Sequence, residues 1–199
     1  MTLYDLKPRF QALLRPLAAL LARAGATANQ VTLTAAALSV ALGAALCAWP
    51  HRRALFLLLP AWLLARMALN AIDGMLAREF GQKSRLGGYL NELCDVVSDA
   101  ALIAPFAFVA PFSAAWTAVV IGLAALSEYA GVMGPLVGAS RRYDGPFGKS
   151  DRALVFGALG AWIGLGLPTP DGLSWLMPLA AALLAATVVN RVRRGLGEP

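Results

Sequence analysis

Polar side chains recur at helical spacing within two neighbouring apolar stretches of the sequence. Asn70 and Asp73 are three residues apart, and Asn91, Asp95 and Asp99 follow one another at steps of four. Residues three or four apart share one face of an α-helix. Each stretch therefore carries a polar stripe on an otherwise apolar helix. Because such groups are costly in hydrocarbon, several of them together favour a functional polar cavity.

The two stripes carry the ligands that hard cations prefer. Glu92 borders the second stripe because it lies three residues before Asp95. A short connection separates the two stretches, so we expect an antiparallel hairpin in which the stripes face each other. Carboxylate and amide oxygens suit Mg²⁺, Mn²⁺ or Ca²⁺, and without a cation the neighbouring carboxylates would repel one another. The candidate metal ligands are Asn70, Asp73, Asn91, Glu92, Asp95 and Asp99.

The composition is that of a membrane protein. Of the 199 residues, 59% are hydrophobic and 14% are charged, and the mean hydropathy is +0.65. Soluble domains have about 45–50% apolar and about 25% charged residues. The composition excludes a soluble domain, a disordered chain and a disulfide-stapled secreted scaffold. The net charge of +6 comes from short basic clusters between apolar runs, which favours anchoring beside anionic lipid over binding of nucleic acid.

Six apolar runs approach the length of about 20 residues that a membrane-spanning helix needs. They cover residues 31–50, 54–77, 87–111, 113–138, 152–168 and 172–190. We predict a single all-α domain over residues 1–199, in which residues 26–199 form a bundle of six transmembrane helices.

The segment before the first run has a different pattern. Residues 1–25 mix leucines with Lys7, Arg9, Arg15 and Arg23, which is typical of an amphipathic helix lying in the membrane interface. We predict an interfacial segment over residues 1–25. Two prolines, Pro8 and Pro16, argue against one unbroken helix there.

The positions of the basic residues predict the orientation in the membrane. With a cytoplasmic N-terminus, most of the 17 Lys and Arg residues fall on the cytoplasmic side, and the outer connections at 110–116 and 168–172 carry none. This asymmetry favours a multi-pass protein with both termini in the cytoplasm. Two charged residues, Arg66 and Glu128, instead lie within the second and fourth runs.

The polar stripes are part of a longer motif. The sequence reads Asn70-Ala-Ile-Asp73-Gly74-Met-Leu-Ala77-Arg78, then eight residues, then Gly87-x₃-Asn91-x₃-Asp95. This resembles the signature D-x₂-D-G-x₂-A-R-x₈-G-x₃-D-x₃-D of the CDP-alcohol phosphatidyltransferase family, with the same spacing throughout. Before the first run, Ala28-Asn29-Gln30-Val31-Thr32 resembles the family's P-N-x-x-T stretch, with Ala in place of Pro.

The resemblance extends over nearly the whole chain. The layout of six runs and the N-terminal segment are similar to those of this family. The N-terminus and the stretch GPFGKSDRA at 145–153 resemble a bacterial inner-membrane subgroup in particular. By resemblance we therefore expect a homodimer in the bacterial cytoplasmic (inner) membrane.

The resemblance implies a reaction and roles for particular residues. A CDP-linked lipid such as CDP-diacylglycerol would donate its phosphatidyl group to an alcohol and release CMP, as in phospholipid biosynthesis. By position, Asp73 would bind one or two ions of Mg²⁺ or Mn²⁺, and Asp95 would be the general base. The residues expected to contact the CDP moiety are Asn29, Thr32, Gly74, Ala77, Arg78 and Gly87.

The sequence departs from the family signature at two positions. Asn70 and Asn91 stand where the signature has Asp, and each change removes one negative charge while keeping an oxygen ligand. Glu92 and Asp99 are close enough on their helix to compensate. One alternative is a degenerate member that binds a nucleotide-linked lipid, or another lipid, without efficient turnover. A small ion transporter is another, but it leaves the spacing of the glycine, alanine and arginine residues unexplained.

Three basic residues are candidates for binding the acceptor. Lys149, Arg152 and Arg191 lie near helix ends where, by resemblance, relatives hold the phosphate of a phosphorylated acceptor. Arginine suits bidentate recognition of phosphate, and lysine acts as a point charge. A polyol phosphate such as glycerol 3-phosphate is one expected acceptor, and an unphosphorylated alcohol such as serine is the alternative.

Overall fold

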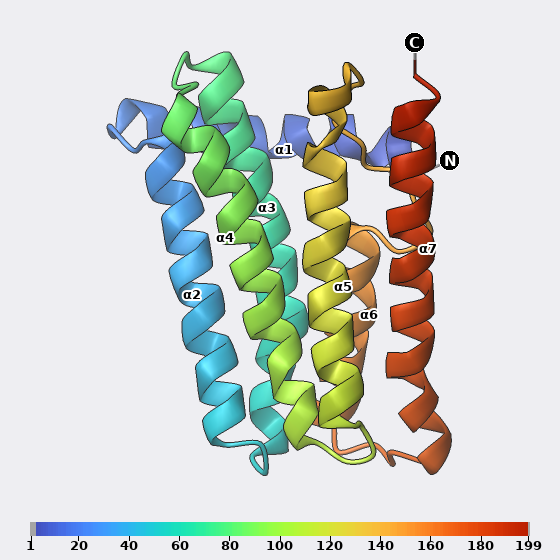
Figure 1. The fold of residues 1–199 in the computed structure, drawn as a ribbon. Helices are drawn as coiled ribbons and strands as arrows, with labels where there is room; N and C mark the ends of the chain where they lie inside the picture. Colours follow the sequence, from blue (N-terminus) through green and yellow to red (C-terminus); the bar gives the residue numbers. More distant parts are fainter. Residues whose placement is uncertain (1–2, 199) are drawn as a thin grey trace. The chain divides into compact units, whose positions relative to one another are not determined.

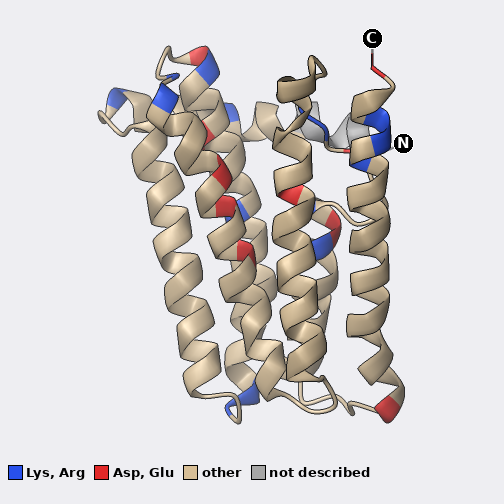
Figure 2. Cartoon of the chain, viewed as in Figure 1, with Lys and Arg blue, Asp and Glu red and all other residues tan. Residues whose placement is uncertain are grey.

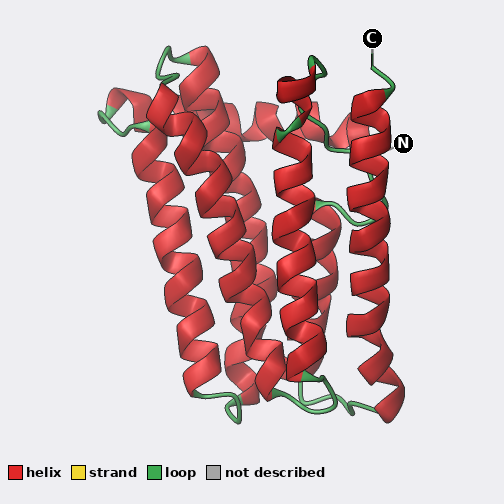
Figure 3. Cartoon of the chain, viewed as in Figure 1, coloured by secondary structure: helices red, strands yellow, loops and turns green. Residues whose placement is uncertain are grey.

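A computed structural model describes the backbone of residues 3–198 and the side chains of residues 10–198. The side chains of Lys7 and Arg9, on which part of the predicted interfacial pattern rests, lie outside the described residues. Over the part described, the chain consists of helices joined by short loops and contains no strand (Figure 3). The prediction of an all-α protein is confirmed.

The helices follow the predicted runs closely. The α-helices of the described chain are α1 (Leu3–Arg23), α2 (Ala28–Ala48), α3 (Leu58–Glu79), α4 (Arg85–Ile103), α5 (Ala114–Val132), α6 (Lys149–Gly164) and α7 (Leu176–Leu196) (Figure 1). Short 3-10 helices are η1 (Arg53–Leu57), η2 (Ala104–Phe108), η3 (Gly134–Val137) and η4 (Asp171–Trp175).

Four stretches of the described chain are long and apolar enough to cross a membrane. They are Ala28–Ala48, Arg53–Glu79, Ala114–Val132 and Asp171–Leu196. The helix α4 differs from these because acidic residues are spaced along it (Figure 2). The helix α6 differs because it has only 16 residues. The predicted membrane character is therefore confirmed through four candidate spans.

The chain divides into two compact units. Unit 1 comprises Met1–Leu38 and Leu64–Ser98, and unit 2 comprises Ser39–Leu63 and Asp99–Pro199. The division falls inside α2, α3 and α4, so each of these helices contributes one part to each unit.

In unit 1, one face of α1 packs on α2 and α3. Ala18 is fully buried in an apolar cluster that includes Val31 of α2 and Ile72 of α3. The helix α1 continues through Pro8 and Pro16, so the predicted break is wrong. A proline inside a helix costs about 3 kcal/mol, and we attribute the continuity to the packing of this face.

A neighbouring face of α1 is apolar and exposed. Leu13, Leu17 and Leu20 are each at least 45% exposed, and their spacing places them on one face of the helix. Within unit 1, α1 runs crosswise to α2, α3 and α4 (Figure 1). Arg15 joins α1 to the end of α3, because its Nε and Nη2 donate to the Glu79 carboxylate at 2.9 and 3.1 Å.

In unit 2, the core is built around aromatic rings and close helix contacts. The ring of Phe106 lies 6.0 Å from that of Phe56 and 5.4 Å from that of Phe156. A Cβ at Gly160 would lie 2.8 Å from the Cβ of Leu59. Glycine on α6 therefore allows a close approach to the start of α3, and the core that results supports the helices that carry the buried charges described below.

Candidate active site

Asp73 is held in place by a hydroxyl group from the neighbouring helix. It lies on α3 and is 5% exposed, and its Oδ2 accepts a 2.7 Å hydrogen bond from Oγ1 of Thr32 on α2. The start of α2 is fixed by Gln82. Its Oε1 accepts from the backbone N–H of Ala28 at 2.7 Å, and its Nε2 donates to the carbonyl of Ala26 at 3.2 Å. These contacts set the register in which Thr32 reaches Asp73.

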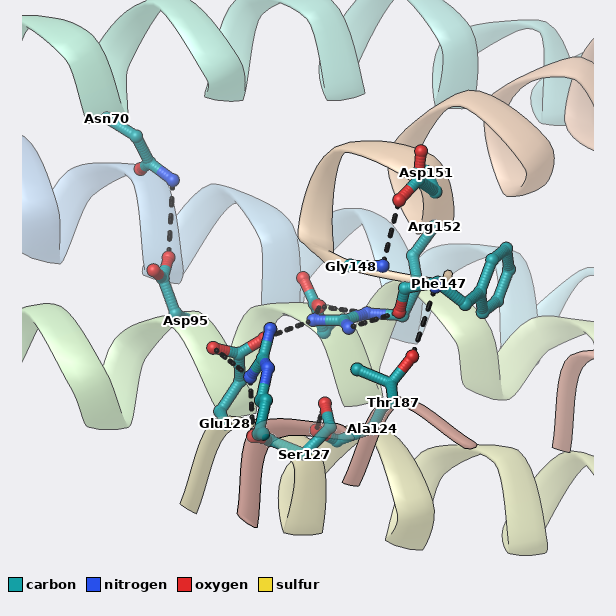
Figure 4. A network of polar contacts seen from close by, with 12 residues as sticks. Asn70, Asp95, Ala124, Ser127, Glu128, Phe147, Gly148, Asp151, Arg152 and Thr187 are labelled. Atoms are coloured by element: carbon teal, nitrogen blue, oxygen red, sulfur yellow. Dashed lines mark hydrogen bonds and ion pairs between the residues drawn. The ribbon is translucent and has the colours of Figure 1, made fainter. Parts of the chain in front are cut away.

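Asp95 on α4 is bound by two side chains of α3, and we call Arg66, Asn70 and Asp95 the Asp95 cluster. Arg66 Nη2 donates to Oδ1 of Asp95 at 3.2 Å and to its backbone carbonyl at 3.1 Å. Asn70 Nδ2 donates to the same Oδ1 at 3.2 Å (Figure 4). The predicted hairpin of the two stretches is confirmed, and it brings Asn70 and Asp95 together.

The oxygen donors near the Asp95 cluster fit a hard divalent cation. Two carboxylates, Asp73 and Asp95, are accompanied by the side-chain carbonyls of Asn70 and Asn91, and oxygen donors of this kind suit Mg²⁺ or Mn²⁺. Asn91 Nδ2 lies 3.4 Å from Oε1 of Glu92. Among the described residues, no three His, Cys, Asp or Glu side chains form a group that could hold a metal ion. Any such site would therefore need oxygen donors besides carboxylates, such as amide, hydroxyl, water or substrate oxygens.

The residues expected to contact the CDP moiety lie in unit 1, and two pairs of them are close. A Cβ at Gly87 would lie 2.8 Å from Oδ1 of Asn29. A Cβ at Gly74 would lie 2.9 Å from Nη2 of Arg78. A side chain at either position would crowd these polar groups, so each glycine allows its polar neighbour to approach the helix closely. Arg78 is exposed, whereas Ala77 is partly buried.

A second set of buried charges lies in unit 2, and we call Asp99, Glu128, Arg152 and Arg191 the Glu128 cluster. Arg152 Nη2 donates to Asp99 Oδ2 at 2.7 Å. It also donates to Glu128 Oε1 at 2.9 Å (Figure 4). Arg152 Nε donates to the same Asp99 oxygen at 3.0 Å. Arg191 Nη1 lies 3.4 Å from Glu128 Oε2 and donates to the carbonyl of Ser127. Each arginine is 2% exposed.

The loop before α6 is tied to α7 and to the residues after it. Asp144 accepts from Arg142 Nε at 2.9 Å and from Arg194 Nη1 at 2.8 Å. Burial opposes the shift, but the contacts with these two arginines hold the pKa of Asp144 below its ordinary value. Hydrogen bonds from the backbone N–H and hydroxyl of Ser140, together with Arg142, lower the pKa of Glu198.

The acceptor candidates have different surroundings. Lys149 is the first residue of α6 and is partly buried. Arg152 and Arg191 are buried against carboxylates that the sequence pattern did not predict as their partners. Asp99, expected among the metal ligands, is bound by Arg152.

The sequence pattern predicted no site role for Arg66, Glu128 or Gln82. For Arg66, a signal was present, because it lies four residues before Asn70 and is a charge inside an apolar run. For Glu128, its place inside the fourth run was a similar signal. The contact of Gln82 with the start of α2 had no signal in the sequence.

Comparison with known proteins relates the chain to a family and to two named proteins. A sequence model of the CDP-alcohol phosphatidyltransferase family matches residues 25–189. The inner membrane protein YnbA of Escherichia coli strain K12 is 46% identical over 196 residues, covering 97% of this chain and 96% of that protein. The phosphatidylinositol phosphate synthase of Mycobacteroides abscessus is 28% identical over 195 residues, covering 94% and 87%.

Two crystal structures of the Mycobacterium tuberculosis phosphatidylinositol phosphate synthase are similar in fold. The structure with CDP-DAG bound has a TM-score of 0.76 at 24% identity, covering 94% of this chain and 96% of that one. The complex with manganese and citrate has a TM-score of 0.74 at 25% identity, covering 92% and 89%.

Proposed function

The chain belongs to the CDP-alcohol phosphatidyltransferase family, and on this premise we propose that it transfers the phosphatidyl group of a CDP-linked lipid to an alcohol. The donor would be CDP-diacylglycerol or a similar lipid, and CMP would be released. The observation that most supports this proposal is the full signature spacing over residues 70–95, together with the convergence of Thr32 on Asp73 and of Asn70 on Asp95.

The reaction requires a proton acceptor beside the attacking hydroxyl. The alcohol oxygen forms a bond to the phosphorus that carries diacylglycerol, and the bond from this phosphorus to the CMP oxygen breaks. We assign Asp95 as the base that accepts the hydroxyl proton. The hydrogen bonds from Arg66 and Asn70 would fix the direction of this carboxylate.

We assign the metal-binding role to Asp73, Asp95 and the side-chain carbonyls of Asn70 and Asn91. A bound Mg²⁺ or Mn²⁺ would neutralise charge that develops on the pyrophosphate of the donor. Thr32 would orient Asp73 through its 2.7 Å hydrogen bond. We give Asp99 a different role, that of holding Arg152.

The CDP moiety would lie along the start of α2 and the facing ends of α3 and α4. In this proposal the exposed guanidinium of Arg78 binds a phosphate, and Gly74 and Gly87 leave room for the nucleotide. Asn29 lies beside Gly87, where its amide could bind a polar group of the cytidine. Thr32 and Ala77 are the remaining residues proposed to contact the CDP moiety.

For the acceptor we propose an alcohol, with a polyol phosphate such as glycerol 3-phosphate as one candidate. Lys149, Arg152 and Arg191 would bind its phosphate. Because Arg152 and Arg191 are already paired with Glu128, a phosphate would have to compete with that carboxylate. An unphosphorylated alcohol avoids this competition.

In the membrane we propose six spans, with α4 and α6 joining the four apolar helices. The acids of α4 that face Arg66 and Arg152 are paired, which lowers their cost in hydrocarbon. The exposed leucines of α1 would lie in the interface. By the excess of basic residues we place both termini in the cytoplasm, and by family likeness we propose a homodimer in the inner membrane.

A second candidate function is binding of a CDP-linked lipid without efficient turnover. It is favoured by Asn70 and Asn91, and by the engagement of Asp95 Oδ1 by Arg66. In that case the donor lipid would raise the thermal stability of the purified protein, while no CMP would form.

The test supplies purified protein with CDP-diacylglycerol, Mg²⁺ or Mn²⁺, and a panel of alcohols. The panel pairs glycerol with glycerol 3-phosphate, and inositol with inositol phosphate, and includes serine. We expect a new phospholipid, identified by mass, with one member of the panel. Stabilisation by the donor without any new lipid would instead support the second candidate.

A further inference from the structure

Arg66 is a buried cation on the same helix face as the candidate metal ligands of α3. It precedes Asn70 by four residues and Asp73 by seven, which places all three side chains on one face of α3. Its side chain is 4% exposed, and α3 belongs to one of the four candidate membrane spans. An arginine at such a position needs an acidic partner.

Arg66 pairs with Asp95, to which the proposed function gives the roles of general base and metal ligand. The guanidinium binds Oδ1 at 3.2 Å and also the backbone carbonyl of the same residue at 3.1 Å. Asn70 donates to the same Oδ1 at 3.2 Å. The contact to the backbone as well as the side chain ties Arg66 to this turn of α4.

The charges of the site differ strongly from those of a four-acid pattern. The family signature has Asp at all four of the positions that this chain fills with Asn70, Asp73, Asn91 and Asp95. Two of the four carboxylates are thus replaced by neutral amides, and Arg66 adds a positive charge to one that remains. The four positions together with Arg66 carry a net charge of about −1, or about −2 with Glu92, which contacts Asn91 at 3.4 Å, whereas four aspartates alone would carry about −4. A second divalent cation would meet a guanidinium and too few carboxylates to balance it.

We propose that Arg66 limits this site to one divalent cation by binding Asp95 and supplying a fixed positive charge in place of a second ion. The proposal rests on the proposed function only in assuming that the site takes up a divalent ion. Asp73, with the carbonyls of Asn70 and Asn91, provides the remaining oxygen donors for that ion. Arg66 is a positioning residue, because it acts through Asp95.

The experiment counts Mn²⁺ ions bound to the purified full-length protein, by equilibrium binding and by electron paramagnetic resonance. A single ion gives an isolated Mn²⁺ spectrum, whereas two neighbouring ions give a coupled one. We expect one Mn²⁺ per wild-type chain. We also expect one in Asn70→Asp/Asn91→Asp, because Arg66 is still present.

Removing the arginine in that background should admit the second ion. Arg66→Gln/Asn70→Asp/Asn91→Asp should bind two Mn²⁺ with a coupled spectrum, the second at least about tenfold tighter than any second ion in the variant that keeps Arg66. The variant Arg66→Lys/Asn70→Asp/Asn91→Asp, which keeps a positive charge at position 66, should bind one Mn²⁺. Arg15→Gln in the same background is the matched control, because it removes an arginine from an exposed ion pair and should leave the count at one.

Three results would overturn the proposal. The first is that the wild type binds two coupled Mn²⁺ ions, or none. The second is that Asn70→Asp/Asn91→Asp binds two Mn²⁺ ions. The third is that Arg66→Gln/Asn70→Asp/Asn91→Asp binds only one. Gel filtration and helical circular dichroism establish that each variant is folded. If the variant with Arg66→Gln fails these checks, Arg66→Met takes its place in the same background. The Mn²⁺ counts of the wild type and of Asn70→Asp/Asn91→Asp can each overturn the proposal without it.

The release of CMP from CDP-diacylglycerol, measured on the same samples, separates this proposal from the proposed function. If the number of bound Mn²⁺ ions depends on Arg66 but no sample releases CMP, the role of Arg66 is upheld and transfer is contradicted. If CMP is released but the number of bound Mn²⁺ ions does not depend on Arg66, transfer is upheld and the role of Arg66 is contradicted.

Discussion

The Asp95 cluster and the Glu128 cluster are both buried and charged, but they are balanced differently. In the Glu128 cluster two carboxylates meet Arg152 and Arg191, and a third arginine, Arg141, lies 3.8 Å from Glu128. In the Asp95 cluster one arginine meets one carboxylate at 3.2 Å, and the nearby acid Asp73 is bound by a neutral hydroxyl. In the first arrangement the arginines at least balance the acids, whereas in the second the acids Asp73 and Asp95 outnumber Arg66. We therefore interpret the first as a support for the fold that also holds Arg152 and Arg191 in place, and the second as suited to binding a cation.

Substituting the two aspartates Asp95 and Asp99 of α4 should distinguish the two clusters most strongly. Asp95→Asn should lower the rate of CMP release by about 10²- to 10⁴-fold, because it removes the proposed general base. The variant should remain in the membrane fraction and keep its helical content. Asp99→Asn, one helical turn away, is the control and should lower stability more than activity. Near-normal turnover by Asp95→Asn would contradict the role of Asp95.

Removing an arginine from the Glu128 cluster should destabilise the fold. Arg152→Ala leaves Asp99 and Glu128 without their shared partner, and breaking a buried pair in this way costs about 3–5 kcal/mol. The free energy of unfolding in detergent micelles measures this loss. Arg194→Ala, which breaks the more exposed pair with Asp144, should cost about 0–1 kcal/mol. Equal losses in the two variants would argue against a structural role for the cluster.

A smaller change tests how Asp73 is positioned. Thr32→Val keeps the shape of the side chain but removes the hydrogen bond to the Asp73 carboxylate. Hydrogen bonds to charged groups contribute about 1.5–3 kcal/mol, so Mn²⁺ affinity should fall by about tenfold or more. Thr34→Val on the exposed side of α2 is the matched control and should leave the affinity unchanged. If both variants bind Mn²⁺ as the wild type does, the hydroxyl of Thr32 does not position a ligand.

The smallest expected effect concerns pH and lies outside both clusters. The pKa of Glu198 is lowered by Ser140 and Arg142, so its stabilising contribution is present above its unfolded pKa and is lost as the pH falls through its folded pKa. Wild type should therefore be slightly more stable than Glu198→Gln at neutral pH. This difference in stability should disappear once the pH falls below the lowered pKa of Glu198 in the folded protein. A difference that persists in acid would contradict an ionised Glu198 as its source.

The sequence allowed the helical architecture and the hairpin of α3 and α4 to be predicted, because both depend on local periodicity. The meeting of Asn70 with Asp95 followed from the same periodicity. The continuity of α1 through Pro16 did not, since it depends on packing against α2 and α3. The pairing of Glu128 with Arg152 and Arg191 was also out of reach, because these residues lie far apart in the chain and only tertiary packing brings them together.

The most direct test of the central claim is CMP formation from CDP-diacylglycerol by the purified wild-type protein. We expect CMP only when donor, alcohol and Mg²⁺ or Mn²⁺ are all present, in an amount equal to the new phospholipid. Chelation of the metal should stop the reaction. No CMP with any alcohol tested, or CMP that forms equally well after chelation, would contradict the claim.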